Sequence, residues 1–215
     1  MPDFSPTQLA VPGFVLLVLA EMIWARYRRP DAYEPKDTLV SLAFGLGSTV
    51  AGVLFGGVVL ALFLWLCQFR LFDFGEQWWT VWWAWLVAFV LDDLRYYWFH
   101  RFAHRVRWFW ASHVNHHSSQ HYNLSTALRQ TWTGFFAAGF LFAAPLVLLG
   151  FHPAMLAIVA GFNLIYQFWI HTEAIGRMPR WFEAMMNTPS HHRLHHATTP
   201  RCLDDNYASG FIASD

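Results

Sequence analysis

Histidines gather in three short segments of this 215-residue chain, and all twelve lie at or beyond position 100. The segments read HRFAH, SHVNHH and HHRLHH, with spacings of i, i+4 in the first and HxxHH in the other two. The eight residues in these patterns are His100, His104, His113, His116, His117, His192, His195 and His196. Such spacings place side chains on one side of a helix, so we expect each segment to present its rings together.

Clustered imidazoles are best explained as metal ligands, because neutral imidazole binds iron, copper, nickel and zinc. Eight rings exceed what one ion needs, since a zinc site takes at most four protein ligands. Two metal ions are therefore expected. Carboxylates are scarce around the segments, in contrast to the glutamate-based di-metal sites of four-helix bundles.

The remaining histidines are interpreted one by one. His171, in QFWIHTE, follows an apolar segment where it should reach the membrane surface, and we predict that it is a ninth ligand. His121 is assigned a surface or substrate role, and His191 is a second-choice ligand beside His192. His152 lies in a turn expected on the far side of the membrane and should bind no metal.

Polar residues near the segments are candidates for supporting roles. Asp93 and Tyr96 precede His100 by seven and four residues on the same helical face. Asp93 is expected either to orient a ligand ring or to pair with a neighbouring arginine. Asn187 precedes the third segment and is expected to bond a ligand ring or to form the turn before Pro189.

The composition indicates a membrane protein. Hydrophobic residues make up 56% of the chain and charged residues 13%, with thirteen Trp and twenty-one Phe. A net charge of zero provides no electrostatic basis for binding nucleic acid. Cys67 and Cys202 are distant in sequence and are interpreted as free thiols.

Apolar segments predict an all-α integral membrane fold of about four to five helical segments with a cytoplasmic, histidine-rich di-metal cap. These segments are residues 9–25, a retained membrane helix, then 38–67, 78–99, 131–149 and 153–170. The third is expected to continue as one helix into the first histidines, and the last two to form a hairpin or a re-entrant pair. Residues 1–77 would be membrane scaffold and residues 78–215 the catalytic domain.

Basic residues predict the orientation. If residues 26–29 are cytoplasmic, alternating crossings place every Lys and Arg except Arg70 on that side. The three histidine segments fall on the same side. We therefore expect a multi-pass protein whose histidines face the cytoplasm.

The three histidine boxes resemble those of the fatty acid hydroxylase/sterol desaturase superfamily of membrane di-iron enzymes. Within it, the blocks HHSSQHYNLSTALRQ, NLIYQFWIHTE and NTPSHHRLHH are similar to the alkylglycerol monooxygenase-like branch. The resemblance runs from about Asp93 to Ile212. It implies a four-crossing helical fold, two iron ions held by the eight box histidines with His171, dioxygen as co-substrate, and a reduced pterin or another electron donor.

Two features depart from this family pattern. Arg105 stands where the ether-lipid enzymes have an acidic residue. The chain stops at Asp215, with Ser214 where the family has a tryptophan, so the catalytic domain is expected to be truncated at its C-terminus.

The sequence thus predicts a membrane di-iron oxidoreductase that uses dioxygen to hydroxylate a C–H bond of an ether lipid, a fatty-acyl lipid or a sterol. A lipid desaturase, a di-zinc hydrolase and a non-catalytic metal-binding membrane protein are the alternatives. The block after the second box is expected to meet the substrate through Tyr122, Asn123, Thr126 and Gln130. Membrane lipid and an unidentified electron donor are the expected partners.

Overall fold

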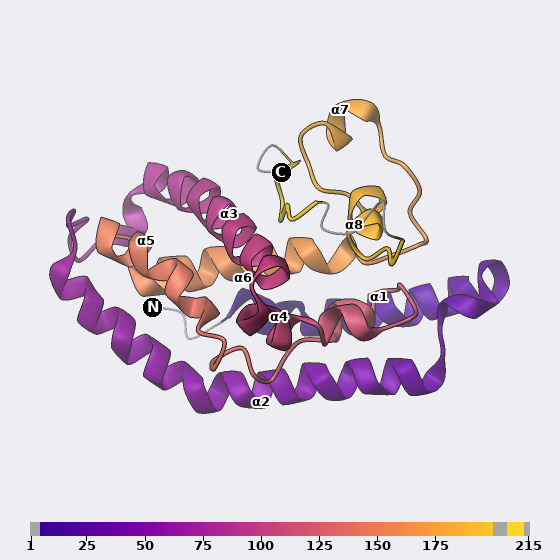
Figure 1. Ribbon diagram of the computed structural model, residues 1–215. Coiled ribbons are helices and arrows are strands. Elements are labelled where there is room, and N and C mark those ends of the chain that lie inside the picture. Colours follow the sequence, from indigo (N-terminus) through magenta and orange to yellow (C-terminus); the bar gives the residue numbers. More distant parts are fainter. Residues whose placement is uncertain (1–4, 200–205, 213–215) are drawn as a thin grey trace.

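The computed structural model describes residues 5–199 and 206–212, and these residues form helices joined by turns, with no strand among them (Figure 1). The longer helices are α1 (Pro6–Arg28), α2 (Pro35–Leu66), α3 (Trp82–Arg105) and α6 (Pro153–Trp169). Short helices are α4 (Arg107–His113), α5 (Ala144–Leu149), α7 (Arg180–Glu183) and α8 (Pro189–His195). Single 3₁₀ turns cover Pro30–Ala32, Cys67–Phe69, Trp78–Thr80, His116–Ser118 and Thr126–Leu128, and a longer one Gly139–Ala143.

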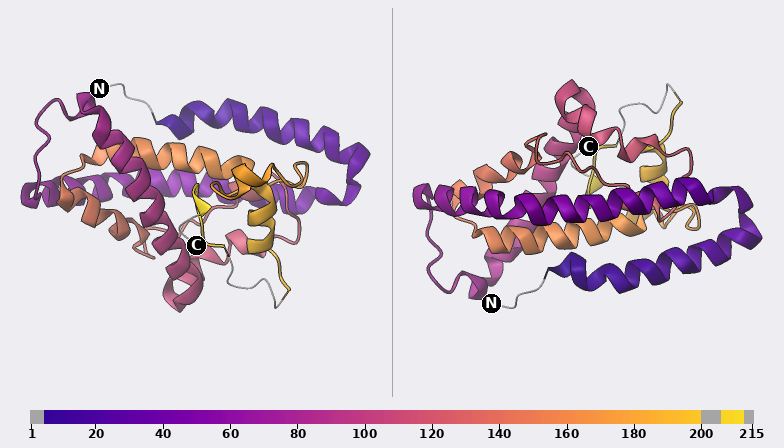
Figure 2. Two further views of the ribbon diagram at one scale, coloured as in Figure 1. Left: turned by 90° about the horizontal axis from the view of Figure 1, so that it is seen from above. Right: turned by 90° about the horizontal axis from the view of Figure 1, so that it is seen from below.

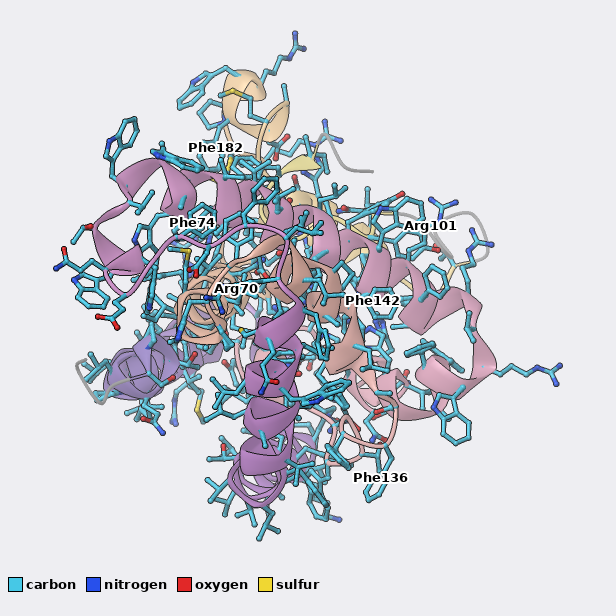
Figure 3. All side chains as sticks on the ribbon, turned by 90° about the vertical axis from the view of Figure 1, so that its left-hand side faces the viewer. Arg70, Phe74, Arg101, Phe136, Phe142 and Phe182 are labelled. Atoms are coloured by element: carbon cyan, nitrogen blue, oxygen red, sulfur yellow. The ribbon has the colours of Figure 1, made fainter. Side chains whose placement is uncertain are left out.

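Two of the described helices, α1 and α2, are long and apolar enough to cross a membrane. They have 23 and 32 residues, which at a rise of about 1.5 Å correspond to about 35 and 48 Å, more than a bilayer core of about 30 Å. Each begins with proline in its first turn, where the missing N–H costs nothing, and the Glu34 carboxylate caps α2 by accepting from the Asp37 N–H at 2.6 Å. Apolar side chains of α2 such as Val53 and Leu54 are exposed. Figure 3 shows side chains projecting outward all around the molecule.

Helix α6 lies at the centre of the fold. Figure 2 shows it between α1 on one side and α3 on the other, and it contacts both. The main apolar core forms where Met155 and Val159 of α6 meet Ala84 and Ala88 of α3 and Val147 of α5, all fully buried. The small alanines let α3 approach α6 closely, so the histidines at the end of α3 are placed beside the end of α6.

Helix α3 continues without a break through the first histidine segment, as the absence of Gly and Pro predicted. It ends at Arg105 because Val106 is extended, with φ −112° and ψ 119°, and the chain turns into α4. The α3 helix therefore connects the apolar core with the histidine-rich end of the molecule.

The expectation of a helix over residues 131–149 is wrong for its first part. Residues 131–138 form turns, and helix begins only at Gly139. Ala138 takes a left-handed conformation with φ 57°, and the Trp132 indole N–H donates to the Phe44 carbonyl of α2 at 2.9 Å. These contacts hold the segment against α2, so that its apolar side chains line a cavity instead of forming a full helical span.

The last described segment, residues 206–212, folds back over the histidine region. Phe211 forms an isolated antiparallel bridge with Met186, and the Asn187 N–H donates to the Gly210 carbonyl at 2.8 Å. This segment thereby ties the α7–α8 region to α3. Cys67 is a free thiol as predicted, while Cys202, Ser214 and Asp215 lie outside the described residues.

Candidate metal centre and adjoining cavity

Nine histidines converge in two groups at one end of the fold. The first group consists of His100, His104, His113, His117 and His195, and the second of His116, His171, His192 and His196. Within each group, one ring nitrogen of every member lies within 4.8 Å of the others. These nine are the residues predicted as ligands from the sequence, and the structure divides them between two sites.

Each of the two HxxHH segments contributes histidines to both groups. In the second segment, His113 and His117 join the first group while His116 points to the other. In the third segment the pattern is reversed, because His192 and His196 join the second group and His195 the first. The expectation that each segment keeps its rings on one side was therefore wrong. Helix α4 ends at His113 and a 3₁₀ turn begins at His116, which turns neighbouring rings in different directions.

Distances between ring nitrogens fit a metal ion. The Nε2 atoms of His171 and His192 are 3.0 Å apart, those of His171 and His116 are 3.2 Å apart, and those of His113 and His117 are also 3.2 Å apart. Two nitrogens that bind one ion at about 2.1 Å and at right angles would be about 3.0 Å apart. Buried Nε2 atoms of His104 and His196 have no hydrogen-bond partner among the described residues. The donor set therefore suits two ions.

Backbone carbonyls orient three of the rings. The Nδ1–H of His171 donates to the Gln167 carbonyl at 2.7 Å, that of His100 to Tyr207 at 3.1 Å, and that of His116 to Arg129 at 3.3 Å. A carbonyl accepts only, so it fixes the tautomer that leaves Nε2 unprotonated and directed into the group.

Burial keeps these rings neutral. Loss of hydration lowers the pKa of His116 to about 4 and holds the pKa of His113 and His192 well below its usual range, and neighbouring histidines lower it further. At neutral pH their nitrogen lone pairs are available to a metal.

The other three histidines lie outside both groups. His152 stacks on Trp78 at 4.5 Å and caps α6 by accepting from the Ala154 N–H. The His121 Nδ1–H donates to the Asp31 carbonyl at 3.0 Å, and His191 lies beside Thr188. None of the three belongs to a group of potential metal ligands among the described residues.

Two carboxylates, buried Glu21 and partly buried Asp37, lie behind the histidine groups and were not identified from the sequence. Glu21 of α1 accepts from the Tyr33 hydroxyl at 2.5 Å, the Leu124 N–H at 2.7 Å and the Thr172 hydroxyl, next to His171. Asp37 of α2 pairs with buried Arg129 at 2.8 Å, and the Arg129 carbonyl orients His116. Glu21 could have been found from the sequence, because it is an acidic residue inside an apolar run.

Asp93 is connected to the candidate metal centre only through backbone groups. Its carboxylate accepts from the N–H groups of Gly210 at 2.7 Å and Phe211 at 3.3 Å, while Arg95 pairs with Asp92 instead. It thus holds the segment whose Tyr207 carbonyl orients His100. Asn187 contributes to the same attachment, since its side-chain amide donates to the Ala208 carbonyl at 2.7 Å. In the described part of the chain, neither contacts a ligand ring directly, and Asp93 forms no ion pair with Arg95 or Arg101, so both roles considered for Asp93 and the first considered for Asn187 are wrong.

Arg105, which departs from the family pattern, contacts the same segment. Its Nε–H donates to the Tyr207 hydroxyl at 3.1 Å, so the cation lies at the edge of the first histidine group.

The residues expected to meet the substrate are placed elsewhere. Tyr122 stacks beside His171 at 5.9 Å and donates to the Ile170 carbonyl, and buried Asn123 donates to the Ala32 carbonyl at 2.6 Å. Thr126 is buried in the same loop, and exposed Gln130 donates to the Ala127 carbonyl. None of these four residues lines the cavity described below, and the part of the lining nearest to them in sequence is Thr131 and Trp132, directly after this block.

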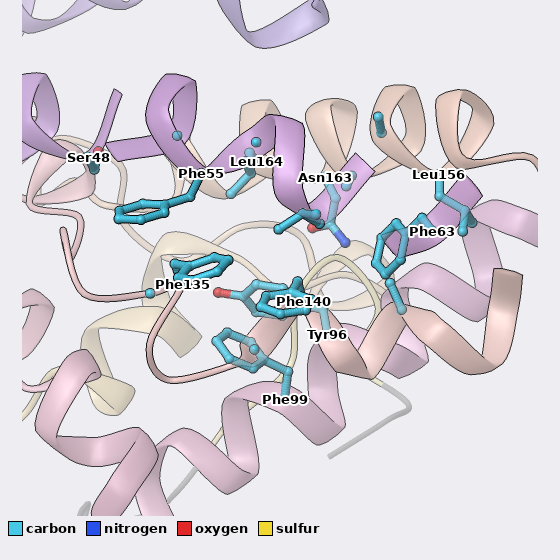
Figure 4. A pocket seen from close by; sticks show the side chains of 18 of the residues that line it. Ser48, Phe55, Phe63, Tyr96, Phe99, Phe135, Phe140, Leu156, Asn163 and Leu164 are labelled. Carbon is cyan, nitrogen blue, oxygen red and sulfur yellow. The ribbon is translucent and has the colours of Figure 1, made fainter. Parts of the chain in front are cut away.

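A cavity of about 610 Å³ adjoins the centre (Figure 4). Its walls are mostly apolar and come from α2, α3, the 131–143 segment and α6. Figure 4 shows Phe55, Phe135, Phe140 and Phe63 around the space, with Tyr96 and Asn163 on facing walls. Tyr96 lines the cavity and its ring lies 5.4 Å from that of His100, so this wall of the cavity is next to the first histidine group.

The described part of the chain is all-helical, with two membrane-length helices and two convergent groups of histidines that could hold metal ions, and this places the chain in the class of histidine-rich helical proteins. Residues 85–215 match the fatty acid hydroxylase family, and the chain belongs to this family. It is 42% identical to alkylglycerol monooxygenase of Danio rerio over 96% of its own length and 45% of the relative, and 39% identical to that of Homo sapiens over 100% and 47%. A relative from Caenorhabditis elegans is 34% identical over 86% of the chain and 36% of that protein.

The chain spans about half the length of the curated relatives it matches. No solved structure matches it. The resemblance drawn from the three histidine boxes is confirmed.

Proposed function

We propose that the chain is a membrane-bound, di-iron, dioxygen-dependent oxidoreductase that hydroxylates a C–H bond of a long-chain lipid, with an ether lipid as first candidate. The observation that carries the proposal is a mostly apolar cavity whose wall residue Tyr96 lies beside His100 of the first of the two histidine groups. Membership in the fatty acid hydroxylase family and similarity to alkylglycerol monooxygenases support it.

The metal centre would use residues of all three boxes. The five ring nitrogens of the first group would together hold one iron ion, and the four of the second group would hold another. Iron supplies the redox chemistry with dioxygen when bound. Neither group holds a carboxylate among the described residues. This favours an oxidative site over a di-zinc hydrolase, which usually needs a carboxylate base.

The protein would contribute substrate position and exclusion of water. Facing walls of α2 and α6 extend from Ser48 to Phe63 and from Pro153 to Gln167, about 20 Å at the rise of a helix. The hydrocarbon of one bilayer leaflet is about 15 Å thick, so the cavity can hold most of a membrane lipid chain. Tyr96 would place one part of that chain beside His100.

Orientation in the membrane follows from the charged ends of the helices. Arg28 and Arg29 end α1 close to the histidines, since Arg29 pairs with Glu173 two residues after His171. Arg70 and Asp73 pair in the loop at the opposite end of α2. We infer a multi-pass protein with α3 and α6 as further crossings and with its histidines on the cytoplasmic face.

Hydroxylation needs two electrons from outside, because one oxygen atom enters the lipid and the other leaves as water. A reduced pterin is one candidate donor. The decisive experiment gives the purified protein iron, heavy-isotope dioxygen, a donor and a panel of lipids. Label in a hydroxylated product supports the proposal. Alkene products would favour a desaturase, and two zinc ions without oxygen uptake would favour the hydrolase.

A further inference from the structure

An ion pair lies in the wall of the mostly apolar cavity. Asp92 and Arg95 stand one turn apart on α3, and both line the cavity. The Arg95 Nε–H donates to Asp92 Oδ1 at 2.6 Å, and the side chains are 15% and 2% exposed. Removing two charges from water costs free energy, so a largely buried ion pair on an apolar wall indicates a functional role.

The Asp92 carboxylate is satisfied on both oxygens. Its second oxygen accepts from the Asn163 side-chain amide at 3.3 Å. The Gln167 amide donates in turn to Asn163 Oδ1 at 2.7 Å and to the Ser209 hydroxyl at 3.1 Å. This network fixes Asp92, and therefore the position of Arg95, against α6 and the last described segment.

Arg95 retains donors that the described residues do not use. A guanidinium group has five N–H donors, and only that on Nε has a partner in the described part of the chain. Its nearest ring neighbour is Tyr96, with 6.0 Å from the guanidinium carbon to the ring centre. Arg95 is partly buried in the cavity wall, and its unused N–H groups are not among the enclosed atoms, so a ligand in the cavity that brings an oxygen atom can accept from them.

We propose that Arg95 determines lipid specificity by donating to the oxygen-bearing end of a neutral long-chain lipid, such as the hydroxyl, ether or ester oxygen of a glyceryl lipid. The inference rests on the proposed function, in which this cavity holds the lipid. Asp92 already balances the charge of Arg95. A carboxylate or phosphate here would add an uncompensated negative charge in an apolar wall, which disfavours a free fatty acid.

The position of Arg95 also decides which part of the lipid reaches the metal centre. Arg95 precedes His100 by five residues, about 7.5 Å along α3, with Tyr96 between them. The oxygen-bearing end would thus lie within one to two helical turns of the first histidine group. The remaining cavity, toward Phe63 and Leu156, would hold the apolar tail.

Equilibrium binding tests the proposal separately from catalysis. The protein is placed in lipid nanodiscs, and binding of three radiolabelled ligands of equal chain length is measured without added metal or donor. These are a glyceryl ether, the free fatty acid and the plain hydrocarbon. We expect the glyceryl ether to bind most tightly, by roughly tenfold over the other two.

Two variants act on the ion pair in opposite ways. Asp92→Asn leaves the Arg95 cation unbalanced, so affinity for the fatty acid should rise roughly tenfold while that for the glyceryl ether changes little. The double variant Asp92→Asn/Arg95→Met strands no charge and should bind the glyceryl ether no better than the hydrocarbon. Phe63→Leu, in the apolar wall, is the matched control and should alter binding of all three ligands alike.

A wild-type protein that binds the fatty acid as tightly as the glyceryl ether would overturn the inference. So would an Asp92→Asn variant that gains no affinity for the fatty acid. If selectivity appears as expected but no lipid is hydroxylated under any condition, the proposed function fails and the lipid selectivity of Arg95 stands.

Discussion

The imidazole rings of His117 and His196 stack at a centroid distance of 4.4 Å with 20° between their planes, although they belong to different histidine groups. His117 follows α4 and His196 follows α8, so the contact joins the second and third histidine segments. The two candidate metal sites therefore share a packed boundary and are not independent pockets. Substitution of a histidine whose neighbouring histidines all belong to its own group can show whether the two sites bind metal independently.

His171 is such a residue. Its Nε2 lies 3.0 Å from that of His192 and 3.2 Å from that of His116, both in the second group. His171→Ala should reduce the metal content from about two ions per chain to about one, because the first group keeps all five members. Elemental analysis of the purified protein measures this.

His152→Ala is the control for this substitution, since His152 stacks on Trp78 away from both groups. It should retain both metal ions. Retention of two ions by the His171 variant would remove this residue from the ligand set.

Asp93 should tune the first group from a distance. Asp93→Ala removes the acceptor for the Gly210 and Phe211 N–H groups and loosens the segment whose Tyr207 carbonyl orients His100. Loss of a partner that orients a ligand typically lowers metal affinity about 10–100-fold. Chelator competition measures the affinity, and Asp73→Ala, at an exposed carboxylate in the distant loop, should leave it unchanged.

Glu21 should matter more for stability than its position in an apolar helix suggests. Glu21→Gln weakens three hydrogen bonds that join α1 to Tyr33, Leu124 and Thr172, and should lower the free energy of unfolding by about 1–3 kcal/mol. Glu173→Gln breaks a partly exposed pair with Arg29 and should cost about 0–1 kcal/mol. Equal losses in reversible denaturation in detergent would contradict the buried role of Glu21.

Spacing in the sequence identified the histidines that converge, because i, i+3 and i, i+4 repeats report local helical geometry. It could not assign them to two groups. That division depends on the end of α4 at His113 and on packing against α8, which is some eighty residues away.

Supporting residues such as Glu21 and Tyr207 could not be identified from local spacing either, because their contacts join segments about a hundred residues apart. The 131–149 segment was expected to be one helical segment, spanning or re-entrant, because its composition is apolar. Composition does not reveal that Trp132 is hydrogen-bonded to α2 and that helix begins only at Gly139.

Membrane orientation can be tested with a pair of exposed sites. In a background with Cys67 and Cys202 replaced by serine, Gln120→Cys lies on the histidine side and Glu76→Cys in the loop after α2. An impermeant thiol reagent applied to intact cells should label only the cysteine at position 76, and the cysteine at position 120 only after the cytoplasmic side is opened. The opposite pattern would place the histidines outside the cell.

The length of the cavity should set the length of the lipid chain. Gly56 and Gly57 are neighbours on α2, and a Cβ atom added at either meets nothing within 4 Å, so leucine fits at both. The helix propensity of leucine exceeds that of glycine by roughly 0.5–1 kcal/mol, so neither substitution should destabilise α2. Only Gly56 lines the cavity. Gly56→Leu should therefore project a side chain into the space and weaken binding and turnover of long-chain lipids while shorter chains are retained. Gly57→Leu should keep the wild-type preference. Affinity and product formation measured across a series of chain lengths distinguish the two, and an identical response of both variants would show that lipid tails do not occupy this cavity.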